Sequence, residues 1–365
     1  MHPKHPSLSQ PPSRAVVGAG LIALDVVVPE APDAAPRMQA GGTCGNVLAA
    51  LAYLDWTAYP IARLGDDGPM HRVCQDLAKW GVRLDFVLKE SGDGTPVIAQ
   101  YIRKTASGAT HSFSWRCPTC GADLPRYKPL RITDVERLLP LLPEADVFFF
   151  DRASPGVIRV ATYYRQRGAI VAFEPSSVGD VRLFHEAVSV AQLVKYSRER
   201  VKASEALEDD HEGPGLLIET SGEEGLRFRA RLPGVRNKRW KLMPAIQAQK
   251  VRDTAGCGDW CTAGILHILA TDAARSFFSA DEELLTEAIR YGQALAAWNC
   301  GFEGARGGMY DITKSEFQAS IAALLAGEST QEIGTKAVPP ETPVPSQFTC
   351  PACPSTRSST SVEKR

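Results

Sequence analysis

Short apolar runs alternate with amphipathic segments along most of the chain, and this alternation limits the folds open to it. The apolar runs occupy residues 16–20, 147–150, 169–173, 193–196 and 216–220, and we expect each to form a strand. Continuous apolar runs are typical of strands buried on both faces of a parallel sheet. Expected helices cover residues 45–54, 69–80, 134–142, 156–167, 259–270, 281–299 and 314–325. The pattern predicts a doubly wound α/β sheet, in which ligands bind beyond the carboxyl ends of the strands.

Two segments differ from this pattern. Residues 94–115 hold two strand-like runs around a Ser107-Gly108 turn, which predicts a hairpin outside the main sheet. Residues 15–28 form the most apolar stretch but include Asp25 and two glycines, so we expect a buried strand rather than a membrane span. Capping boxes, with Thr or Ser three residues before Glu, are expected at three helix starts: Thr133/Glu136, Ser279/Glu282 and Thr313/Glu316.

The composition limits the classes of partner and the cellular compartment that we expect for this chain. The chain has 41 basic and 42 acidic residues and a net charge of −1, so no basic field is available for a nucleic acid partner. Residues 1–14 contain four prolines and three serines but lack the apolar core of a signal peptide. We therefore expect a disordered arm at residues 1–14, a Pro/Ser-rich tail at residues 326–365, a cytoplasmic location and no membrane partner.

The run D-T-A-G-C-G-D at residues 253–259 directly precedes an expected helix. Small residues at a helix start let backbone N–H groups converge on an anion, and the helix dipole favours negative charge there. A phosphoryl group in transfer needs such donors, and a carboxylate beside them can accept the proton of the attacking hydroxyl. Asp259 has a second interpretation as a simple helix N-cap. On spacing alone both interpretations remain open.

Residues 253–259 resemble the D-T-x-G-A-G-D signature of the ribokinase-like family, also called the phosphofructokinase B carbohydrate kinases, with Cys257 in place of the usual alanine. Gly41-Gly42 and Asn46, followed by R-L-G-D-D-G at residues 63–68, resemble its G-G-x-x-x-N and x-x-G-x-D-x-x-G motifs. Asp55 stands where the family usually has glycine. The run T-S-G-E-E-G at residues 220–225 is similar to its T-x-G-x-x-G turn beside ATP, and Gly304-Ala305 is a fourth match. Four motifs in the family order, over roughly residues 15–325, are more specific than one.

The resemblance implies one ribokinase-like domain at residues 15–325, with a doubly wound, mostly parallel sheet flanked by helices. A small β-sheet lid would come from about residues 25–40 and 94–116, and a cysteine-containing insertion would follow at about residues 117–130. The implied activity is transfer of the γ-phosphoryl group of ATP to a hydroxyl of a sugar-like small molecule. Mg²⁺ and a monovalent cation such as K⁺ are the implied cofactors. A homodimer through the lid is a further expectation.

The resemblance also implies a role for each matching residue. Asp259 would be the catalytic base, and Gly256, Cys257 and Gly258 would form the anion hole. Substrate would be bound by Asp25, Gly42 and Asn46, and an acidic substrate by Arg103 or Arg152, which are otherwise exposed charges. The nucleotide would be bound by Thr220, Gly222, Gly225, Gln293, Ser197 and Glu199. The monovalent cation would be bound by Asp253 and the carbonyl of Ala255. At a helix N-terminus, Cys257 is also expected to have a lowered thiol pKa.

One departure concerns the N-x-x-E motif that supports magnesium and phosphate in the family. Ser197 holds the Asn position and Arg200 the Glu position, while Glu199 comes one residue early. This departure motivates a rival interpretation, a zinc-stapled, catalytically weak relative that acts as a binding or regulatory module. A nucleoside kinase, with the same fold and base, is the other rival.

Two C-P-x-C pairs, Cys117/Cys120 and Cys350/Cys353, have the spacing of zinc knuckles. Each such turn aims two thiolates at one metal, so two turns complete a tetrahedral Cys₄ site. The site would be closed by four protein ligands and therefore structural. An exposed dithiol, a redox pair and two unrelated loops are the alternatives.

Overall fold

The computed structural model describes residues 14–28, 36–92, 94–105, 108–202, 207, 213–236, 239–328, 350 and 353. The described strands form a nine-stranded sheet, in the order β13-β12-β11-β10-β9-β8-β1-β4-β5, and a four-stranded sheet, in the order β3-β2-β6-β7. The large sheet contains β1 (Ala15–Ala19), β4 (Thr57–Gly65), β5 (Val87–Glu90), β8 (Val147–Phe150), β9 (Ile170–Phe173), β10 (Leu193–Ser197), β11 (Leu216–Thr220), β12 (Leu226–Ala230) and β13 (Lys241–Met243). The small sheet, the lid, contains β2 (Ala23–Val28), β3 (Arg37–Gly41), β6 (Val97–Thr105) and β7 (Gly108–Ser114).

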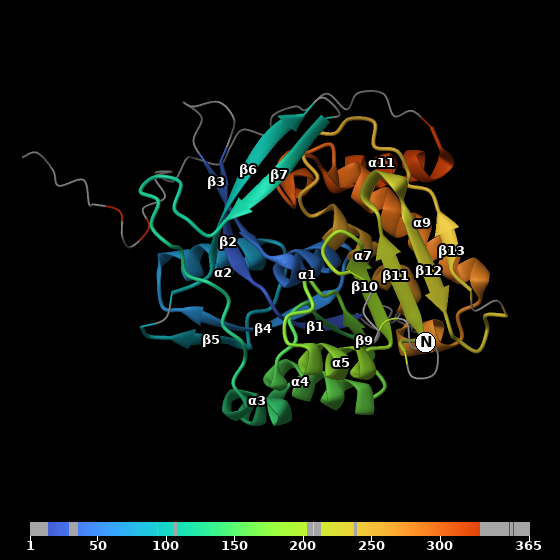
Figure 1. Cartoon of the computed structure of the whole chain (residues 1–365), viewed down its shortest axis with the longest axis horizontal. Helices are drawn as coiled ribbons and strands as arrows, with labels where there is room; N and C mark the ends of the chain where they lie inside the picture. The colour runs from blue at the N-terminus through green and yellow to red at the C-terminus, as the bar shows by residue number, and fades with distance from the viewer. Residues whose placement is uncertain are drawn as a thin grey trace, which may run out of the picture.

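The principal helices cover both faces of the large sheet (Figure 1). They are α1 (Thr43–Tyr53), α2 (Gly68–Lys79), α3 (Ile132–Leu138), α4 (Pro155–Gln166), α5 (Val181–Val190), α7 (Cys257–Leu269), α8 (Ala273–Phe278), α9 (Glu282–Asn299), α10 (Gly307–Asp311) and α11 (Lys314–Ala326). Neighbouring strands from β4 to β11 are parallel, and β12 and β13 add an antiparallel edge. The architecture is the expected α/β fold with a small lid.

Alternate residues of the central strands enter two separate hydrophobic cores. In β1, Val16 belongs to the core that includes residues of α1, α7, α9 and α11, whereas Val17 belongs to the core that includes residues of α3, α4 and α5. In β8, Phe149 enters the first core, and Phe148 and Phe150 enter the second. Because successive side chains of a strand point to opposite faces, apolar residues at every position are what a sheet covered on both sides requires. This explains the continuous apolar runs of the sequence.

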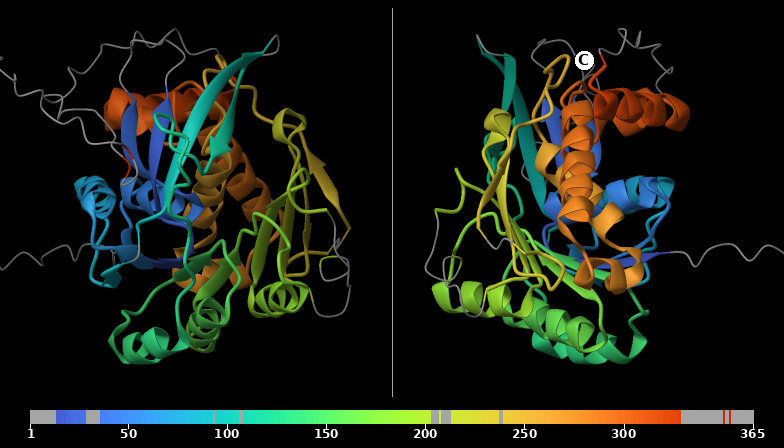
Figure 2. Two further views of the ribbon diagram at one scale, coloured as in Figure 1. Left: turned by 60° about the vertical axis from the view of Figure 1, so that its left-hand side comes forward. Right: turned by 90° about the vertical axis from the view of Figure 1, so that its right-hand side faces the viewer.

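The apolar stretch at residues 15–28 is two strands rather than one. Residues 15–19 form β1 of the large sheet, and residues 23–28 form β2 of the lid, parallel to β6. The chain crosses between the sheets at Gly20, where a Cβ atom would lie 1.7 Å from Oδ1 of Asp151. The expected hairpin forms as β6 and β7, and Figure 2 shows it projecting from the body of the molecule.

Two of the three expected capping boxes are wrong. Helix α3 begins after Arg131 and therefore contains Thr133. Helix α9 is capped by Asp281, whose side chain accepts a hydrogen bond from the amide of Leu284, rather than by Ser279. The Thr313/Glu316 box is confirmed at the start of α11.

Asp55 has a φ of 69°, the one positive φ of a non-glycine residue in the described part of the chain. This backbone conformation favours glycine, which explains why the family usually has glycine at this position. Its carboxylate lies 2.5 Å from Nζ of Lys314 on α11.

Candidate active site

Helix α7 begins at a glycine that no other residue can replace without strain. Gly256 has a φ of 71°, and a Cβ atom there would lie 2.3 Å from the carbonyl oxygen of Ala305. The buried Trp260 donates a hydrogen bond of 3.1 Å from Nε1 to the same oxygen. These contacts fix the helix start against the Gly304-Ala305 segment.

The first turn of α7 carries amides that are available to a ligand. The amides of Cys257 and Trp260 donate to the carbonyls of Thr254 and Gly256. No described residue accepts a hydrogen bond from the amides of Gly258 and Asp259. Unsatisfied N–H groups at a helix N-terminus form an anion site together with the helix dipole.

Asp259 is the third residue of α7 and does not cap the helix, because the N-cap is Gly256. Its carboxylate instead accepts a hydrogen bond of 2.7 Å from Nδ2 of Asn46, on α1. Burial raises the pKa of Asp259 to about 7, and the charge of Glu174 acts in the same direction. Asn46, Lys195 and Arg200 oppose this rise because each favours the ionised carboxylate. A carboxylate with a pKa near neutrality is suited to accept a proton.

An ion pair that the sequence interpretation missed lies beside this helix start. Lys195, in the middle of β10, donates a hydrogen bond of 2.5 Å to Glu174, which follows β9. Thr262 of α7 donates to the other oxygen of Glu174. A Cβ atom on Gly258 would lie 3.6 Å from Glu174 and 3.8 Å from Lys195. Burial alone would lower the pKa of Lys195, but Glu174, Cys261 and Asp259 together outweigh burial and raise the pKa. The available signal was a charged residue directly after a buried strand, at the carboxyl end of a parallel sheet.

Asp25 and Asn46 present buried oxygen atoms without partners. Asp25 is 6% exposed, and its carboxylate packs on Gly41, where a Cβ atom would lie 1.9 Å from Oδ2. Neither Oδ1 of Asp25 nor Oδ1 of Asn46 has a hydrogen-bond partner among the described residues. Burial raises the pKa of Asp25 to about 7, against the opposing effects of Arg306 and the amide of Gly42. Buried acceptors without a protein partner are rare, so these two oxygens are available to accept hydrogen bonds from a ligand.

The two arginines expected to bind an acidic substrate are not brought to this site by any described contact. Arg152 donates from Nη1 to the carboxylate of its neighbour Asp151 at 2.7 Å and to the carbonyl of the same residue. Arg103 lies on β6, and its side chain is outside the described part of the chain. Their roles in substrate binding stay predictions.

The residues expected to bind the nucleotide lie at the ends of β10 and β11, in the turn after β11, and on α9. Thr220 and Ser197 are paired in register at the ends of β11 and β10. Gly222 and Gly225 have positive φ values, and a Cβ atom on Gly225 would lie 2.3 Å from the carbonyl oxygen of Met243. Gln293 is buried on α9 and donates to the carbonyl of Pro244 at 3.1 Å.

The departure from the N-x-x-E motif involves Glu199 and Arg200, which are both exposed at the turn after β10. The charge of Arg200 lowers the pKa of Asp259, whereas Glu174, and not Glu199, is the acid among the largest influences on that pKa. The acid beside Asp259 is therefore Glu174 rather than Glu199.

Protein donors surround the carboxylate of Asp253, which is completely buried. Gln100 of β6 and the amide of Gly304 donate to Oδ2, at 2.6 and 2.9 Å. The amide of Ala255 donates to Oδ1 at 2.9 Å, and Nδ1 of His111 on β7 lies 3.3 Å from it. Burial alone would raise the pKa of Asp253, but these contacts hold it below its usual value.

The other expected cation ligand is also engaged, because the carbonyl of Ala255 accepts a hydrogen bond of 2.8 Å from Nδ2 of Asn299. The sequence interpretation missed Gln100, His111 and Asn299, which lie outside the family motifs. Two of them, Gln100 and His111, connect the lid to Asp253, in the segment that precedes α7.

Cys257 has a thiol partner that reverses its expected acidity. Its sulfur lies 3.0 Å from the sulfur of Cys300, at the end of α9. The hydrogen bond with Cys300 and burial raise the pKa of Cys257. The same hydrogen bond lowers the pKa of Cys300. The expectation of a lowered pKa at Cys257 is therefore wrong, and Cys300 is the more acidic thiol of the pair.

Comparison with known proteins shows similarity to sugar kinases. The family model described as pfkB family carbohydrate kinase matches residues 185–311. The chain is 27% identical over 307 residues to the ATP-dependent ribose-1-phosphate kinase of Halopiger xanaduensis, covering 80% of this chain and 93% of that protein. It is 25% identical over 292 residues to the probable fructokinase-6, chloroplastic, of Arabidopsis thaliana, covering 73% of this chain and 70% of that protein.

Solved structures share the fold. A fructokinase with bound ATP from Xylella fastidiosa superposes with a TM-score of 0.65 at 18% identity, covering 86% of this chain and 98% of that one. The aminoimidazole riboside kinase from Salmonella enterica, complexed with aminoimidazole riboside and an ATP analogue, superposes with a TM-score of 0.61 at 20% identity. The match covers 84% of this chain and 100% of that one. Among the described residues, no helix is both long enough and apolar enough to span a membrane.

Proposed function

The chain belongs to the pfkB family of carbohydrate kinases, and on that premise we propose that it phosphorylates a hydroxyl of a sugar-like substrate with ATP, using Asp259 as the base. The observation that carries this proposal is the position of the Asp259 carboxylate. It lies in the first turn of α7, next to two amides that have no acceptor among the described residues, and burial raises its pKa to about 7.

The proposed reaction is an in-line displacement at the γ-phosphorus of ATP. The substrate hydroxyl oxygen forms a bond to phosphorus while the bond to the β,γ-bridging oxygen breaks, so ADP leaves. The hydroxyl proton passes to the Asp259 carboxylate. The amides of Gly258 and Asp259 donate to the oxygens of the transferring group, whose negative charge they stabilise.

Magnesium would enter this site with ATP and neutralise part of the phosphate charge. The described chain offers Glu174 as an acid beside Asp259, already oriented by Lys195 and Thr262. Glu199 is exposed at the turn after β10, one residue before the position at which the family motif has Glu. We propose Glu174 as the acid on which metal support depends.

Two hydrogen-bond acceptors mark the part of the proposed site that binds the substrate. Oδ1 of Asp25 and Oδ1 of Asn46 are buried and have no partner among the described residues, so each can accept a hydrogen bond from a hydroxyl group. Asn46 also donates to Asp259, which places one of these acceptors next to the base. A molecule with several neighbouring hydroxyls satisfies both, which favours a sugar or the ribose of a nucleoside.

A substrate panel tests the proposed function. ADP release is measured with fructose, ribose, ribose 1-phosphate, aminoimidazole riboside and common nucleosides, which cover the substrate classes of similar kinases and of the rival nucleoside kinase. We expect one hydroxyl compound to be phosphorylated, and Asp25→Asn to raise its KM at least tenfold. The exposed Asp85→Asn serves as the matched control and should leave KM unchanged. ADP release that is equal with and without every compound would contradict the proposal.

A further inference from the structure

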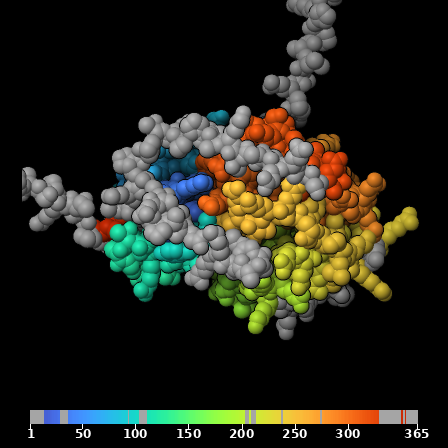
Figure 3. Space-filling view, turned by 90° about the horizontal axis from the view of Figure 1, so that it is seen from above, coloured from blue at the N-terminus to red at the C-terminus, as the bar shows by residue number. Residues whose placement is uncertain are grey.

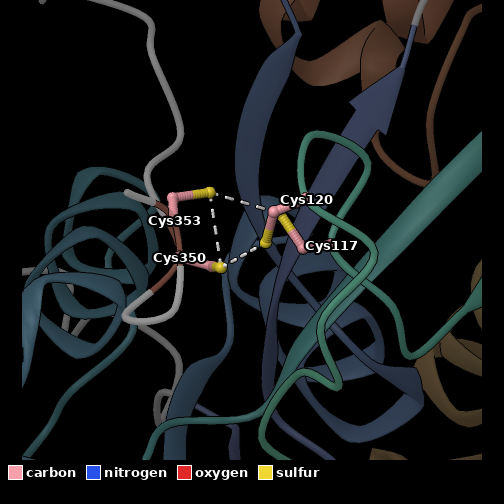
Figure 4. A group of neighbouring side chains, drawn as sticks. All are labelled: Cys117, Cys120, Cys350 and Cys353. Carbon is pink, nitrogen blue, oxygen red and sulfur yellow. Dashed lines mark hydrogen bonds between the residues drawn. The ribbon is translucent and has the colours of Figure 1, made fainter. Parts of the chain in front are cut away.

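Four cysteines from two distant parts of the chain lie together outside the active site. Cys117 and Cys120 belong to the loop after β7, and Cys350 and Cys353 come from the C-terminal region. All four sulfur atoms lie within 4.8 Å of one another. Figure 4 shows the two pairs facing each other, and in Figure 3 the red C-terminal segment lies against the teal loop.

The sulfur separations match a shared metal rather than disulfides. The separations are 3.7 Å for Cys117–Cys353, 3.4 Å for Cys120–Cys350 and 3.5 Å for Cys350–Cys353. A tetrahedral zinc with Zn–S bonds of about 2.3 Å places its sulfur ligands about 3.8 Å apart. A disulfide needs about 2.05 Å and joins sulfurs only in pairs. Here Cys350 approaches two other sulfurs at almost the same distance.

The Cys117 loop has the backbone of a metal knuckle. The amide of Thr119 lies 3.4 Å from the sulfur of Cys117 and donates to it, and the amide of Gly121 donates to the carbonyl of Cys117 at 3.0 Å. Gly121 has a φ of 72°, a conformation that glycine adopts without strain. The amide of Cys117 closes the loop by donating to the carbonyl of Ala122 at 2.8 Å. Hydrogen bonds to sulfur favour the thiolate, which is the form that binds a metal.

We propose that Cys117, Cys120, Cys350 and Cys353 bind one structural Zn²⁺ that fastens the C-terminal region to the base of the lid. Four thiolates are soft ligands that favour zinc over magnesium or calcium. With all four positions taken by protein, no position remains for water or substrate, so the ion is structural. Cys117 and Cys350 are only 3% and 4% exposed, so the site lies at the edge of the core rather than on a loose tail.

The Cys117 loop is joined by hydrogen bonds to both strands of the lid hairpin. The amide of Leu124 donates to the carbonyl of Trp115, directly after β7, at 2.8 Å. The amide of Val97, the first residue of β6, donates to the carbonyl of Pro125 at 3.1 Å. The same two strands carry Gln100 and His111, which contact Asp253. Zinc bound to this loop therefore restrains the base of the hairpin that reaches the active site.

Metal analysis tests the site directly. Untagged protein, purified without added zinc and with its thiols reduced, should contain one equivalent of zinc per chain. The double variant Cys350→Ser/Cys353→Ser should contain less than about 0.2 equivalents. Cys74→Ser, a change at a half-buried cysteine on α2, is the matched control and should keep the full equivalent. Less than 0.2 equivalents in the wild-type chain, or one equivalent of iron instead, would overturn the proposal.

Truncation and hydrogen exchange test whether the metal joins the two segments. A chain ending at Glu328 should lose the zinc, and a retained equivalent would show that Cys350 and Cys353 are not ligands. In the full chain, chelation should increase amide exchange at residues 117–125 at least tenfold and leave α5 unchanged. Unchanged exchange at residues 117–125 in metal-free protein would contradict a restraint on the lid base. Both readouts are independent of the substrate.

Discussion

Nδ2 of Asn46 lies 2.7 Å from Oδ2 of Asp259, and this hydrogen bond joins two motifs separated by most of the chain. Asn46 belongs to α1, which follows the lid strand β3, and Asp259 belongs to α7. The donor stabilises the ionised form of Asp259 and so lowers its pKa, against the larger effect of burial. The balance of these two effects leaves the pKa of Asp259 at about 7.

Asn46→Ala should shift the pH dependence of kcat/KM. Loss of the donor raises the pKa of Asp259, and the base is active only when ionised, so the acid limb should move upward by about one pH unit. The loss of activity should accordingly be greater at pH 6 than at pH 8. An equal loss at every pH would show that Asn46 acts on substrate binding alone.

Glu174 and Glu199 offer a matched pair of substitutions. Glu174 lies beside Asp259 and Gly258 and is bonded to Lys195, whereas Glu199 is exposed. Glu174→Gln should lower kcat at least tenfold and weaken the dependence on Mg²⁺, and Glu199→Gln should change kcat less than threefold. Larger effects at Glu199 would restore it as the metal-supporting acid.

The Cys257–Cys300 pair should make the enzyme sensitive to oxidation. Diamide takes two electrons and two protons from the thiols, whose sulfurs lie 3.0 Å apart, and leaves one disulfide at the start of α7, where the proposed anion site lies. We expect inactivation that dithiothreitol reverses, and resistance in Cys300→Ala. Mass spectrometry should find the 257–300 disulfide. Equal inactivation of wild type and Cys300→Ala would show that other thiols are responsible.

Potassium should have little effect on turnover. A carboxylate has about four lone-pair positions, and the contacts of Asp253 with Gln100, His111, Ala255 and Gly304 occupy this number. The carbonyl of Ala255 is bonded to Asn299. Replacing K⁺ with tetramethylammonium should change kcat/KM less than twofold. A tenfold activation by K⁺ would mean that the ion replaces some of these contacts and binds to Asp253 or Ala255.

Most of the fold is predictable from the sequence because each buried strand is a continuous apolar run. All five expected strands are present with ends within one residue of the expectation. Strand β4 is missed because Pro60 and Arg63 interrupt its apolar pattern. Strand β12 is missed because apolar and charged residues alternate along it, so only one of its faces is buried. The split of residues 15–28 between two sheets depends on the packing of Gly20 against Asp151, a contact between residues far apart in sequence.

The candidate site is predictable where it follows family motifs and not where it depends on distant contacts. The positions of Asp259, Asn46 and Gly256 follow from the motifs, whereas the Lys195–Glu174 pair and the Cys257–Cys300 pair join segments that only the fold brings together. The four-cysteine cluster is an exception, because it joins distant segments and is still predictable. Its two C-P-x-C turns share the same spacing and the same internal proline, and this match alone indicates a shared site. The homodimer through the lid stays a prediction.

Turnover by Asp259→Asn tests the central claim most directly. Asparagine keeps the size of the side chain but cannot accept the proton, so kcat should fall by about two to four orders of magnitude while ATP binding, measured by calorimetry, changes little. Asp85→Asn, an exposed control, should retain wild-type kcat. If Asp259→Asn turns over the identified substrate within threefold of wild type, Asp259 is not the base and the proposed mechanism is wrong.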